Sequence, residues 1–220
     1  MKKVTLGLIV ALFSIISISA SAQETKGAWT TGADFYNRYN WRGSDFGNSP
    51  VVQPTIKYVD GGFTLGAWGS YSLSGVTTAT EADLYMSYAF KSGFSLTLTD
   101  YYFPAEPGSV GNYTKYKAPH MFEISPGFTS GKFSIVANYA FAKVNNDIYV
   151  ETALALKTCS IFVGAGNEQY SSDKNFNIVN IGLSTTKTIA ISDKFSLPLT
   201  GKVILNPEKD QIFFVLGFTL

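Results

Sequence analysis

The single histidine of the sequence, His120, could do chemistry because a neutral imidazole can act as a general base. A base needs a nucleophile within hydrogen-bond reach. On an extended strand that partner would stand two positions away, on the same face. Phe122 occupies this position, and Ser125 is out of phase. We therefore expect His120 to lie at an interface or a loop edge and not to catalyse a reaction.

The single cysteine, Cys159, has no visible helper that would make it a nucleophile or a metal ligand. One cysteine also excludes a disulfide within the chain. The sequence contains no metal-ligand spacing, phosphate-binding loop or dinucleotide motif. These observations predict a protein that is not an enzyme and that uses no metal or cofactor.

Charged residues that alternate with apolar ones form the largest set with chemical potential. They fall on the polar faces of predicted strands: Asp34, Arg38, Arg42, Lys57, Asp83, Glu123, Glu151 and Lys202. Around a hydrated lumen, such mixed charges would favour small polar solutes or ions without strong preference for either sign. The alternative is a salt-bridged interior that closes itself, and the sequence leaves both possibilities open.

Strands must position these residues, because apolar and polar residues alternate along nearly the whole chain and no stretch has a convincing helical period. In the first predicted strand, Tyr39 and Trp41 fall on the apolar face and Arg38 and Arg42 on the polar face. Asn37 interrupts the apolar face there. The predicted strands cover residues 29–42, 51–59, 63–73, 81–91, 94–102, 120–128, 133–141, 148–156, 159–165, 176–185, 195–205 and 211–220.

A short pattern recurs along the chain: a turn-like pair, then Phe, then Ser or Thr, then Leu or Ile, as in SGFSLTL. The turns at 60–62, 92–93 and 130–132 contain Gly and indicate tight hairpins. The aromatic residues after the turns would form a girdle at one membrane interface: Phe63, Phe94, Phe133 and Phe195. Cys159 takes the Phe position in one copy, so we expect it to be a small hydrophobe that faces lipid or the interface.

Longer links lie between the tight turns, the longest at 104–118, and this difference in length is typical of an outer-membrane barrel. A soluble sandwich, or a soluble barrel that binds an apolar ligand, would point its charged face outward instead. The sequence therefore predicts an all-β, up-and-down antiparallel transmembrane barrel of about 12 strands, with short periplasmic turns and longer extracellular loops. The stretch at 186–193 is longer than a tight turn should be.

Prolines inside predicted strands argue against a closed barrel, because each removes a ladder hydrogen bond and a barrel has no free edge. These residues are Pro54, Pro126 and Pro198. They indicate bulges or strand ends placed wrongly.

Charged residues make up 15% of the 220 residues, against ~25% in soluble domains. A lipid-facing wall explains this shortage. Without Lys2 and Lys3 the formal net charge of +1 becomes −1, which provides no basic surface for a nucleic acid. Lys2, Lys3, an apolar run and Ala20-Ser21-Ala22 predict a cleaved signal peptide over residues 1–22, a barrel over 23–220 and a bacterial outer-membrane location.

The last ten residues, QIFFVLGFTL, alternate and place Ile212, Phe214, Leu216, Phe218 and Leu220 on one face. They resemble the C-terminal signal by which barrel-assembly machinery recognises outer-membrane proteins, although Phe or Trp is the commoner last residue. Outer-membrane lipid and this machinery are therefore expected partners. A final core strand of a sandwich would have the same pattern.

The stretch between Tyr39 and Ser70 is the most specific part of the sequence. It contains WRG at 41–43, PVVQ at 50–53, GF at 62–63 and GAWGS at 66–70. In these elements it resembles the opening of the TorF family of small porins. The resemblance is confined to this stretch, and it implies an outer-membrane barrel of porin-like type.

The sequence therefore predicts passive diffusion of small polar solutes or ions through a narrow lumen of mixed charge. The alternative is a non-conducting structural or surface ligand-binding barrel. A lipid-modifying barrel enzyme comes third, because His120 lacks the His-x-Ser pair of such enzymes. The loop at 104–118 could fold into the lumen or bind an external ligand.

Overall fold

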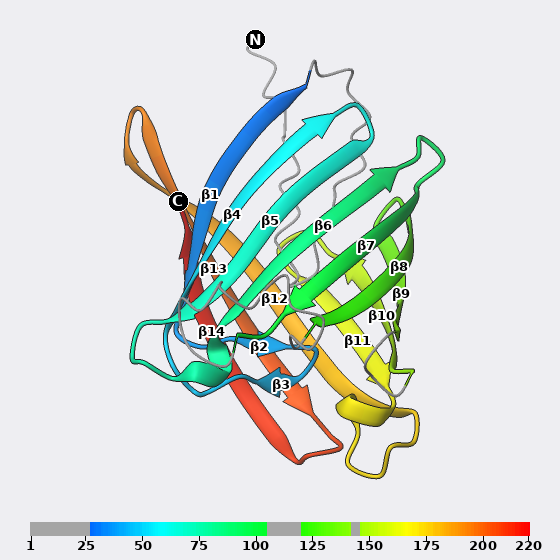
Figure 1. Cartoon of the computed structure of the whole chain (residues 1–220). Coiled ribbons are helices and arrows are strands. Elements are labelled where there is room, and N and C mark those ends of the chain that lie inside the picture. The colour runs from blue at the N-terminus through cyan, green and yellow to red at the C-terminus, as the bar shows by residue number, and fades with distance from the viewer. Residues whose placement is uncertain (1–26, 105–119, 142–145) are drawn as a thin grey trace.

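The structure, a computed structural model, describes residues 27–104, 120–141 and 146–220, which form a closed antiparallel β-barrel (Figure 1). Each wall strand pairs with its neighbours along the chain, and the first strand also pairs with the last. The predicted barrel of about 12 strands is confirmed. The wall strands are β1 (Ala28–Tyr36), β4 (Val51–Asp60), β5 (Phe63–Ser72), β6 (Glu81–Ala89), β7 (Phe94–Tyr102), β8 (His120–Ser130), β9 (Phe133–Phe141), β10 (Ile148–Ala155), β11 (Ser160–Gly166), β12 (Asn177–Ser192), β13 (Phe195–Asn206) and β14 (Gln211–Thr219).

The expected signal peptide and the loop at 104–118, apart from Pro104, lie outside the described residues. In the described part, the tight connections lie at the upper end of the barrel in Figure 1 and the longer ones at the lower end. We call these the turn end and the loop end. The short 3₁₀ helices η1 (Thr77–Ala79) and η3 (Glu168–Tyr170) belong to the loop end.

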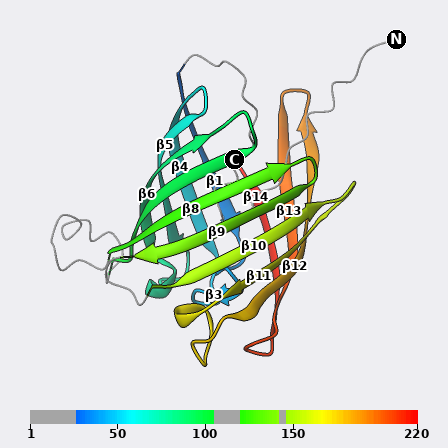
Figure 2. The same ribbon diagram turned by 90° about the vertical axis from the view of Figure 1, so that its right-hand side faces the viewer.

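The stretch at 186–193 is not the long turn that the sequence suggested. Strand β12 continues to Ser192 and pairs with β13 up to Phe195, so the turn between them is tight. Beyond Ser184 the described pairs of β12 are with β13 alone. The two strands therefore extend beyond their neighbours β11 and β14 as a free hairpin (Figures 1 and 2). Apolar and polar residues still alternate in this stretch. Its several small polar residues, and the absence of a Gly to mark a tight turn, made it look like a loop.

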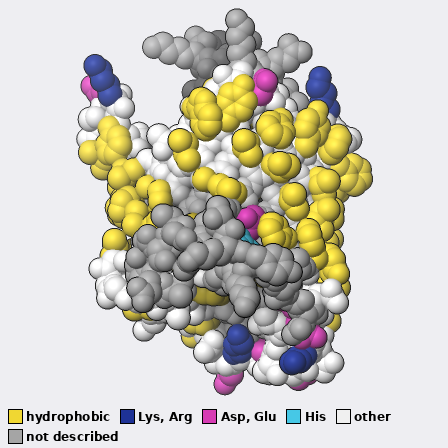
Figure 3. All heavy atoms as spheres, in the orientation of Figure 1, with side chains coloured by type: hydrophobic (Ala, Val, Ile, Leu, Met, Phe, Trp, Pro, Cys, Tyr) yellow, Lys and Arg dark blue, Asp and Glu magenta, His cyan; other side chains and the backbone are white. Residues whose placement is uncertain are grey.

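The two faces of the wall differ in chemistry. Along β6, Asp83 and Tyr85 point inward and are buried, whereas Leu84 and Met86 point outward and are exposed. Hydrophobic side chains gather over the face of the outer wall that Figure 3 shows, and charged side chains on this face lie mostly at the two ends. Because strand residues alternate between faces, the sequence pattern explains both surfaces.

Aromatic rings inside the barrel lie over glycines of the neighbouring strand. A Cβ atom on Gly66 would come within 2.4 Å of the Tyr85 ring, and one on Gly182 within 2.1 Å of the Phe162 ring. Gly66 pairs with Tyr85 and Gly182 with Phe162 in the sheet. The glycines therefore leave room for large side chains to lie flat against the wall.

The first strand ends at Tyr36, not at residue 42 as the alternation predicted. Beyond Tyr36, hydrogen bonds of the Asn37 side chain take the place of the backbone pairing with β14. Its side chain donates a hydrogen bond to the Phe214 carbonyl (3.1 Å) and accepts one from the Leu216 amide (2.9 Å). The residue that interrupts the apolar face thus fastens the strand end to β14, and the chain then leaves the wall.

The prolines lie inside strands and cause no shift of register. The described pairing of β4 with β5 skips residues 53–54, around Pro54, and that of β8 with β9 skips 125–126, around Pro126. Pro198 lies in the part of β13 that pairs only with β12. The missing amide of each proline thus falls where the ladder is already interrupted or absent, so bulges are not needed.

Candidate functional site

Residues 37–50, between β1 and β4, fold back into the barrel as a small hairpin, which we call the inward hairpin. Its strands are β2 (Asn40–Trp41) and β3 (Ser44–Asp45), drawn at the loop end in Figure 1. Arg42 and Gly43 form the turn, with φ of 52° and 81°. Positive φ at both central residues is what a type I′ hairpin turn requires. The tip of the hairpin is therefore Arg42-Gly43.

The base of the inward hairpin is held by contacts within it. The Arg38 guanidinium lies 3.3 Å from an Asp45 carboxylate oxygen and donates a hydrogen bond of 2.8 Å to the Asn48 side chain. The Phe46 amide donates to the Tyr39 carbonyl. Burial raises the pKa of Asp45, and Arg38 opposes this effect. Arg38 therefore stabilises the hairpin itself. The sequence had suggested that it lies on the polar face of a wall strand, and this was wrong.

Arg42 extends from the tip to the opposite wall and forms an ion pair with Glu123 of β8. Its Nη1 lies 2.6 Å from Glu123 Oε2, and its Nη2 lies 2.8 Å from Oε1. Both side chains are only 2% exposed. Burial works against the charge of Arg42, but Glu123 together with Tyr170 and Tyr101 outweighs it and holds the pKa of Arg42 well above its usual value. The pair is thus charged, bidentate and shielded from solvent.

Aromatic rings surround the Arg42 guanidinium. Its central carbon lies 4.4 Å from the centre of the Trp41 ring and 4.8 Å from that of Tyr149. The hydroxyl of Tyr170, in η3, accepts a hydrogen bond of 2.5 Å from Arg42 Nη1. Burial raises the pKa of Tyr170 to about 12, so this hydroxyl keeps its proton at neutral pH. Cation–π contacts of this kind strengthen when water is excluded.

Two further donors saturate the Glu123 carboxylate. The Tyr101 hydroxyl donates to Oε1 at 3.0 Å, and the Ser125 hydroxyl donates to the same oxygen at 3.1 Å. Both donors belong to the wall strands β7 and β8. The carboxylate is therefore fixed by the wall, and Arg42 completes its coordination from the hairpin.

A second contact joins the hairpin to β6. The Tyr39 hydroxyl donates a hydrogen bond of 2.7 Å to Glu81, and the Tyr39 ring packs against Trp68. Burial, followed by the charges of Glu81 and Asp83, raises the pKa of Tyr39 well above its usual value. Tyr39 therefore acts as a neutral donor. The sequence placed Tyr39 and Trp41 on the apolar outer face, and this was wrong because the chain leaves the wall after Tyr36.

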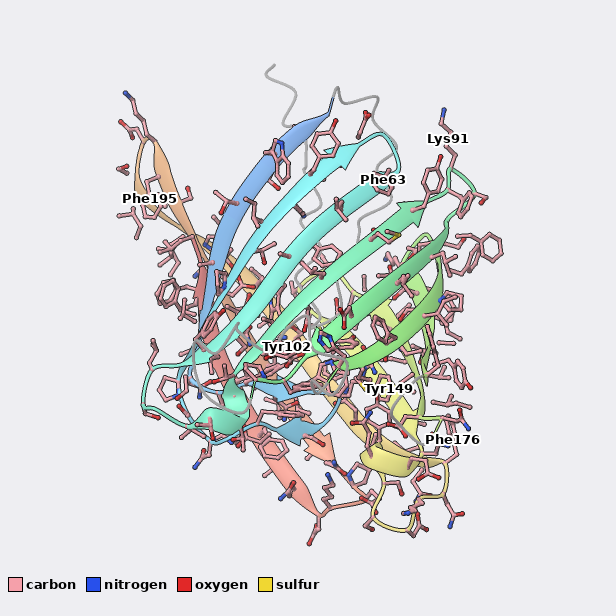
Figure 4. The ribbon with its side chains drawn as sticks, in the orientation of Figure 1. Phe63, Lys91, Tyr102, Tyr149, Phe176 and Phe195 are labelled. Atoms are coloured by element: carbon pink, nitrogen blue, oxygen red, sulfur yellow. The ribbon has the colours of Figure 1, made fainter. Side chains whose placement is uncertain are left out.

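On the far wall, Tyr149 links the hairpin site to a third acidic residue. Its hydroxyl donates to Glu151 at 2.5 Å and accepts from Asn180 at 2.9 Å, and Asn180 also donates to Glu151. Figure 4 labels Tyr149 in the lower half of the barrel, toward the loop end. The carboxylate of Glu151 thus points inward without contacting Arg42 directly.

The backbone of the tip is packed against β12 and β13. A Cβ atom on Gly43 would lie 2.0 Å from the Val179 carbonyl oxygen, so no other residue fits there without movement. The Asn206 side chain donates a hydrogen bond of 3.0 Å to the Gly43 carbonyl. The backbone of the tip is therefore fastened to β12 and β13, which lie near β1 in the barrel. The Arg42 side chain reaches across the lumen to β8.

The remaining predicted lumen residues lie apart from this cluster. Lys202 of β13 points its ammonium toward the Tyr36 ring (5.4 Å), and Asp34 of β1 accepts a hydrogen bond from Thr219. Lys57 is half-buried on β4. Of the charged residues singled out in the sequence, the structure thus brings Arg42 and Glu123 together directly, with Asp83 and Glu151 beside the cluster. Alternation alone could not show the roles of Tyr149, Tyr170 and Glu81.

Other sequence candidates lie on the outer side of the wall. His120 of β8 pairs with Asp100 of β7 at 2.7 Å between Nδ1 and Oδ1. This pair faces away from the inward hairpin, because the inward-pointing residues of this part of β8 are Met121, Glu123 and Ser125. Cys159 lies half-exposed between β10 and β11. The side chains of the expected girdle are between 37% and 57% exposed at the turn end: Phe63, Phe94, Phe133 and Phe195.

No family model and no curated protein matches the chain. Among the described residues, no group of His, Cys, Asp and Glu side chains has an arrangement that would hold a metal ion. The helices in the same part of the chain are all too short and too polar to cross a membrane.

Proposed function

We propose that the protein is an outer-membrane, porin-like barrel that passes small polar solutes or ions, and that the inward hairpin closes its lumen in the state described here. The observation that carries the proposal is the distribution of charge. Glu123, Asp83 and Glu151 are buried inside the wall, whereas residues such as Leu84 and Leu98 are exposed outside it. A soluble barrel would have the reverse arrangement.

The outer surface supports the membrane location. Apolar side chains cover the outer wall (Figure 3), and a charge on a lipid-facing position at mid-depth would cost ~2–4 kcal/mol. The phenylalanines beside the tight turns are placed as an aromatic girdle would be. On this reading, the turn end is periplasmic and the loop end extracellular.

The interior supports a restricted passage. Barrels of twelve strands are wider than the filled eight-strand ones and narrower than open porins, and here a hairpin crosses the space. The fully buried Arg42–Glu123 pair shows that the loop end is packed around the hairpin. Solutes would therefore pass only when the hairpin moves. The Trp-Arg-Gly segment that resembles the TorF family forms its tip, which is consistent with a porin-like protein.

A non-conducting barrel is the second candidate, and the same buried pair favours it. In that case the hairpin is a permanent part of the interior, and the protein acts through its surface or as a structural element. The two candidates share the fold and the membrane location. They differ only in whether the hairpin opens.

Two measurements test the proposal. Protein folded in detergent or lipid vesicles should show heat-modifiable gel mobility and float with the vesicles; failure of both would contradict the membrane location. Single-channel recording in a planar bilayer should show rare, small openings of the wild type. A correctly inserted protein that stays silent even without the inward hairpin would favour the non-conducting barrel.

A further inference from the structure

We propose that the pocket around the Arg42 side chain is a recognition site for guanidinium-bearing cations, and that Arg42 fills it as a tethered occupant. A small solute with a guanidinium group would compete with Arg42 and release the hairpin tip. Only the link between release of the hairpin tip and opening of the lumen rests on the proposed function. Binding itself needs nothing but the folded barrel.

The wall supplies a carboxylate already arranged for a planar fork. Glu123 receives two parallel N–H bonds from Arg42, at 2.6 and 2.8 Å. Tyr101 and Ser125 hold one oxygen of that carboxylate from β7 and β8. Bidentate geometry suits a guanidinium and not an ammonium, which binds as a point charge. The site therefore discriminates by shape as well as by charge.

The wall also supplies faces for the flat cation. Tyr149 from β10 presents its ring 4.8 Å from the guanidinium carbon, and the Tyr170 hydroxyl accepts an N–H bond. Neither residue belongs to the hairpin. If the hairpin left, the pocket would keep the carboxylate of Glu123, the ring of Tyr149 and the hydroxyl of Tyr170. It would lose only the ring of Trp41, which belongs to the hairpin.

The backbone conformation of Arg42 indicates that the residue is present for the contacts of its side chain. Arg42 has φ of 52° at the tip of a type I′ turn, a position that Asn, Asp and Gly favour. An arginine gains nothing from this backbone conformation. Its side chain, however, contacts Glu123. This contact, and not the turn, explains why an arginine occupies the position.

The local charge also favours an incoming cation. The Glu123 carboxylate is the buried counter-charge at the tip of the inward hairpin, with its oxygens 2.6 and 2.8 Å from the Arg42 nitrogens. Arg42 is the cation that meets Glu123 from the tip. When Arg42 withdraws, the carboxylate of Glu123 is left without its counter-charge, and a soluble guanidinium restores it.

The test uses the full-length chain folded in detergent, with methylguanidinium as the probe and methylammonium as the matched control at constant ionic strength. Arg42→Gly removes the side chain and suits the positive φ, so the turn is kept. We expect saturable changes in tryptophan emission, through Trp41, with a Kd on the order of 1 mM. The wild type should respond at least tenfold more weakly, because its own Arg42 occupies the pocket. Arg42→Gly combined with Glu123→Gln should lose the response.

Equal responses to methylammonium and methylguanidinium, or a response that survives Glu123→Gln, would overturn the inference. If Arg42→Gly does not fold, as judged by heat-modifiable mobility, Arg42→Lys takes its place. The lysine keeps a charge but cannot form the fork, so methylguanidinium should displace it and methylammonium should not. Since binding is measured in detergent, a silent bilayer recording would contradict the proposed function and leave this result standing.

Discussion

Arg42 and Glu123, which are 81 positions apart in the sequence, meet inside the barrel through two N–H···O bonds of 2.6 and 2.8 Å. One residue is at the tip of an inward hairpin and the other is on the wall strand β8. Both are shielded from solvent. Their contact fixes the inward hairpin across the lumen.

Breaking this pair from one side should cost far more than breaking the pair at the base of the hairpin. Glu123→Gln leaves a buried guanidinium without its counter-charge, which costs ~3–5 kcal/mol. Asp45→Asn removes the partner of Arg38 in a partly exposed pair, which is worth at most ~1 kcal/mol. Urea unfolding of both variants in lipid vesicles measures the difference. Equal losses of stability would show that burial of the Arg42–Glu123 pair has no special role.

Gly43→Ala should displace the tip of the hairpin. The new Cβ atom would lie 2.0 Å from the Val179 carbonyl oxygen, at a φ of 81°. Gly131→Ala is a matched control, because Gly131 also has positive φ but nothing lies within 4 Å of its Cβ position. We expect Trp41 to become accessible to a soluble quencher in the first variant only. The same quenching in both would mean that backbone strain, and not the contact with β12, is responsible.

The stability of the barrel should fall at high pH, partly through Tyr170. Burial raises its pKa from 10.0 to about 12, so the folded state holds this proton more tightly than the unfolded state does. The folding free energy is then unaffected by Tyr170 below about pH 10 and weakens between pH 10 and 12. Unfolding curves at pH 9 and 11.5 should differ less for Tyr170→Phe than for the wild type. An identical loss in both would contradict the role of this hydroxyl.

Leu84→Lys tests whether the outer wall meets lipid. Leu84 is 49% exposed and lies near the middle of β6. In a membrane the lysine should cost ~2–4 kcal/mol, whereas on a soluble surface it should cost nothing measurable. Asp60→Lys, at the turn end of β4, is the control and should be tolerated in either case. Unfolding in vesicles that leaves Leu84→Lys as stable as the control would contradict a lipid-facing wall.

The wall of the barrel could be predicted from the sequence because alternation and turn chemistry act locally. In β6, for example, the alternation of Asp83 and Tyr85 with Leu84 and Met86 already indicates which side chains point inward. Tight turns that contain Gly61 or Gly131, both with positive φ, mark where the strands reverse. The ranges expected for the strands therefore agree closely with the structure over most of the wall.

The candidate site could not be predicted in the same way. Residues 37–42 alternate with the same period as a wall strand, so Tyr39 and Trp41 looked outward-facing. What turns the chain inward is the bonding of Asn37 to β14 and the attraction of Arg42 to Glu123. Both are contacts between residues far apart in sequence, and a local period carries no information about them. The positive φ of Arg42 likewise has no mark in the sequence except the following glycine.

We propose that the inward hairpin closes a barrel that would otherwise conduct. Tyr36 and Val51 are paired directly across β1 and β4, so an Asn-Gly turn can replace residues 37–50 without disturbing the wall. In a planar bilayer, this variant should give stable open channels, while the wild type stays mostly closed under the same conditions. Correctly folded variant protein that inserts and carries no more current than the wild type would contradict closure of the lumen by the inward hairpin.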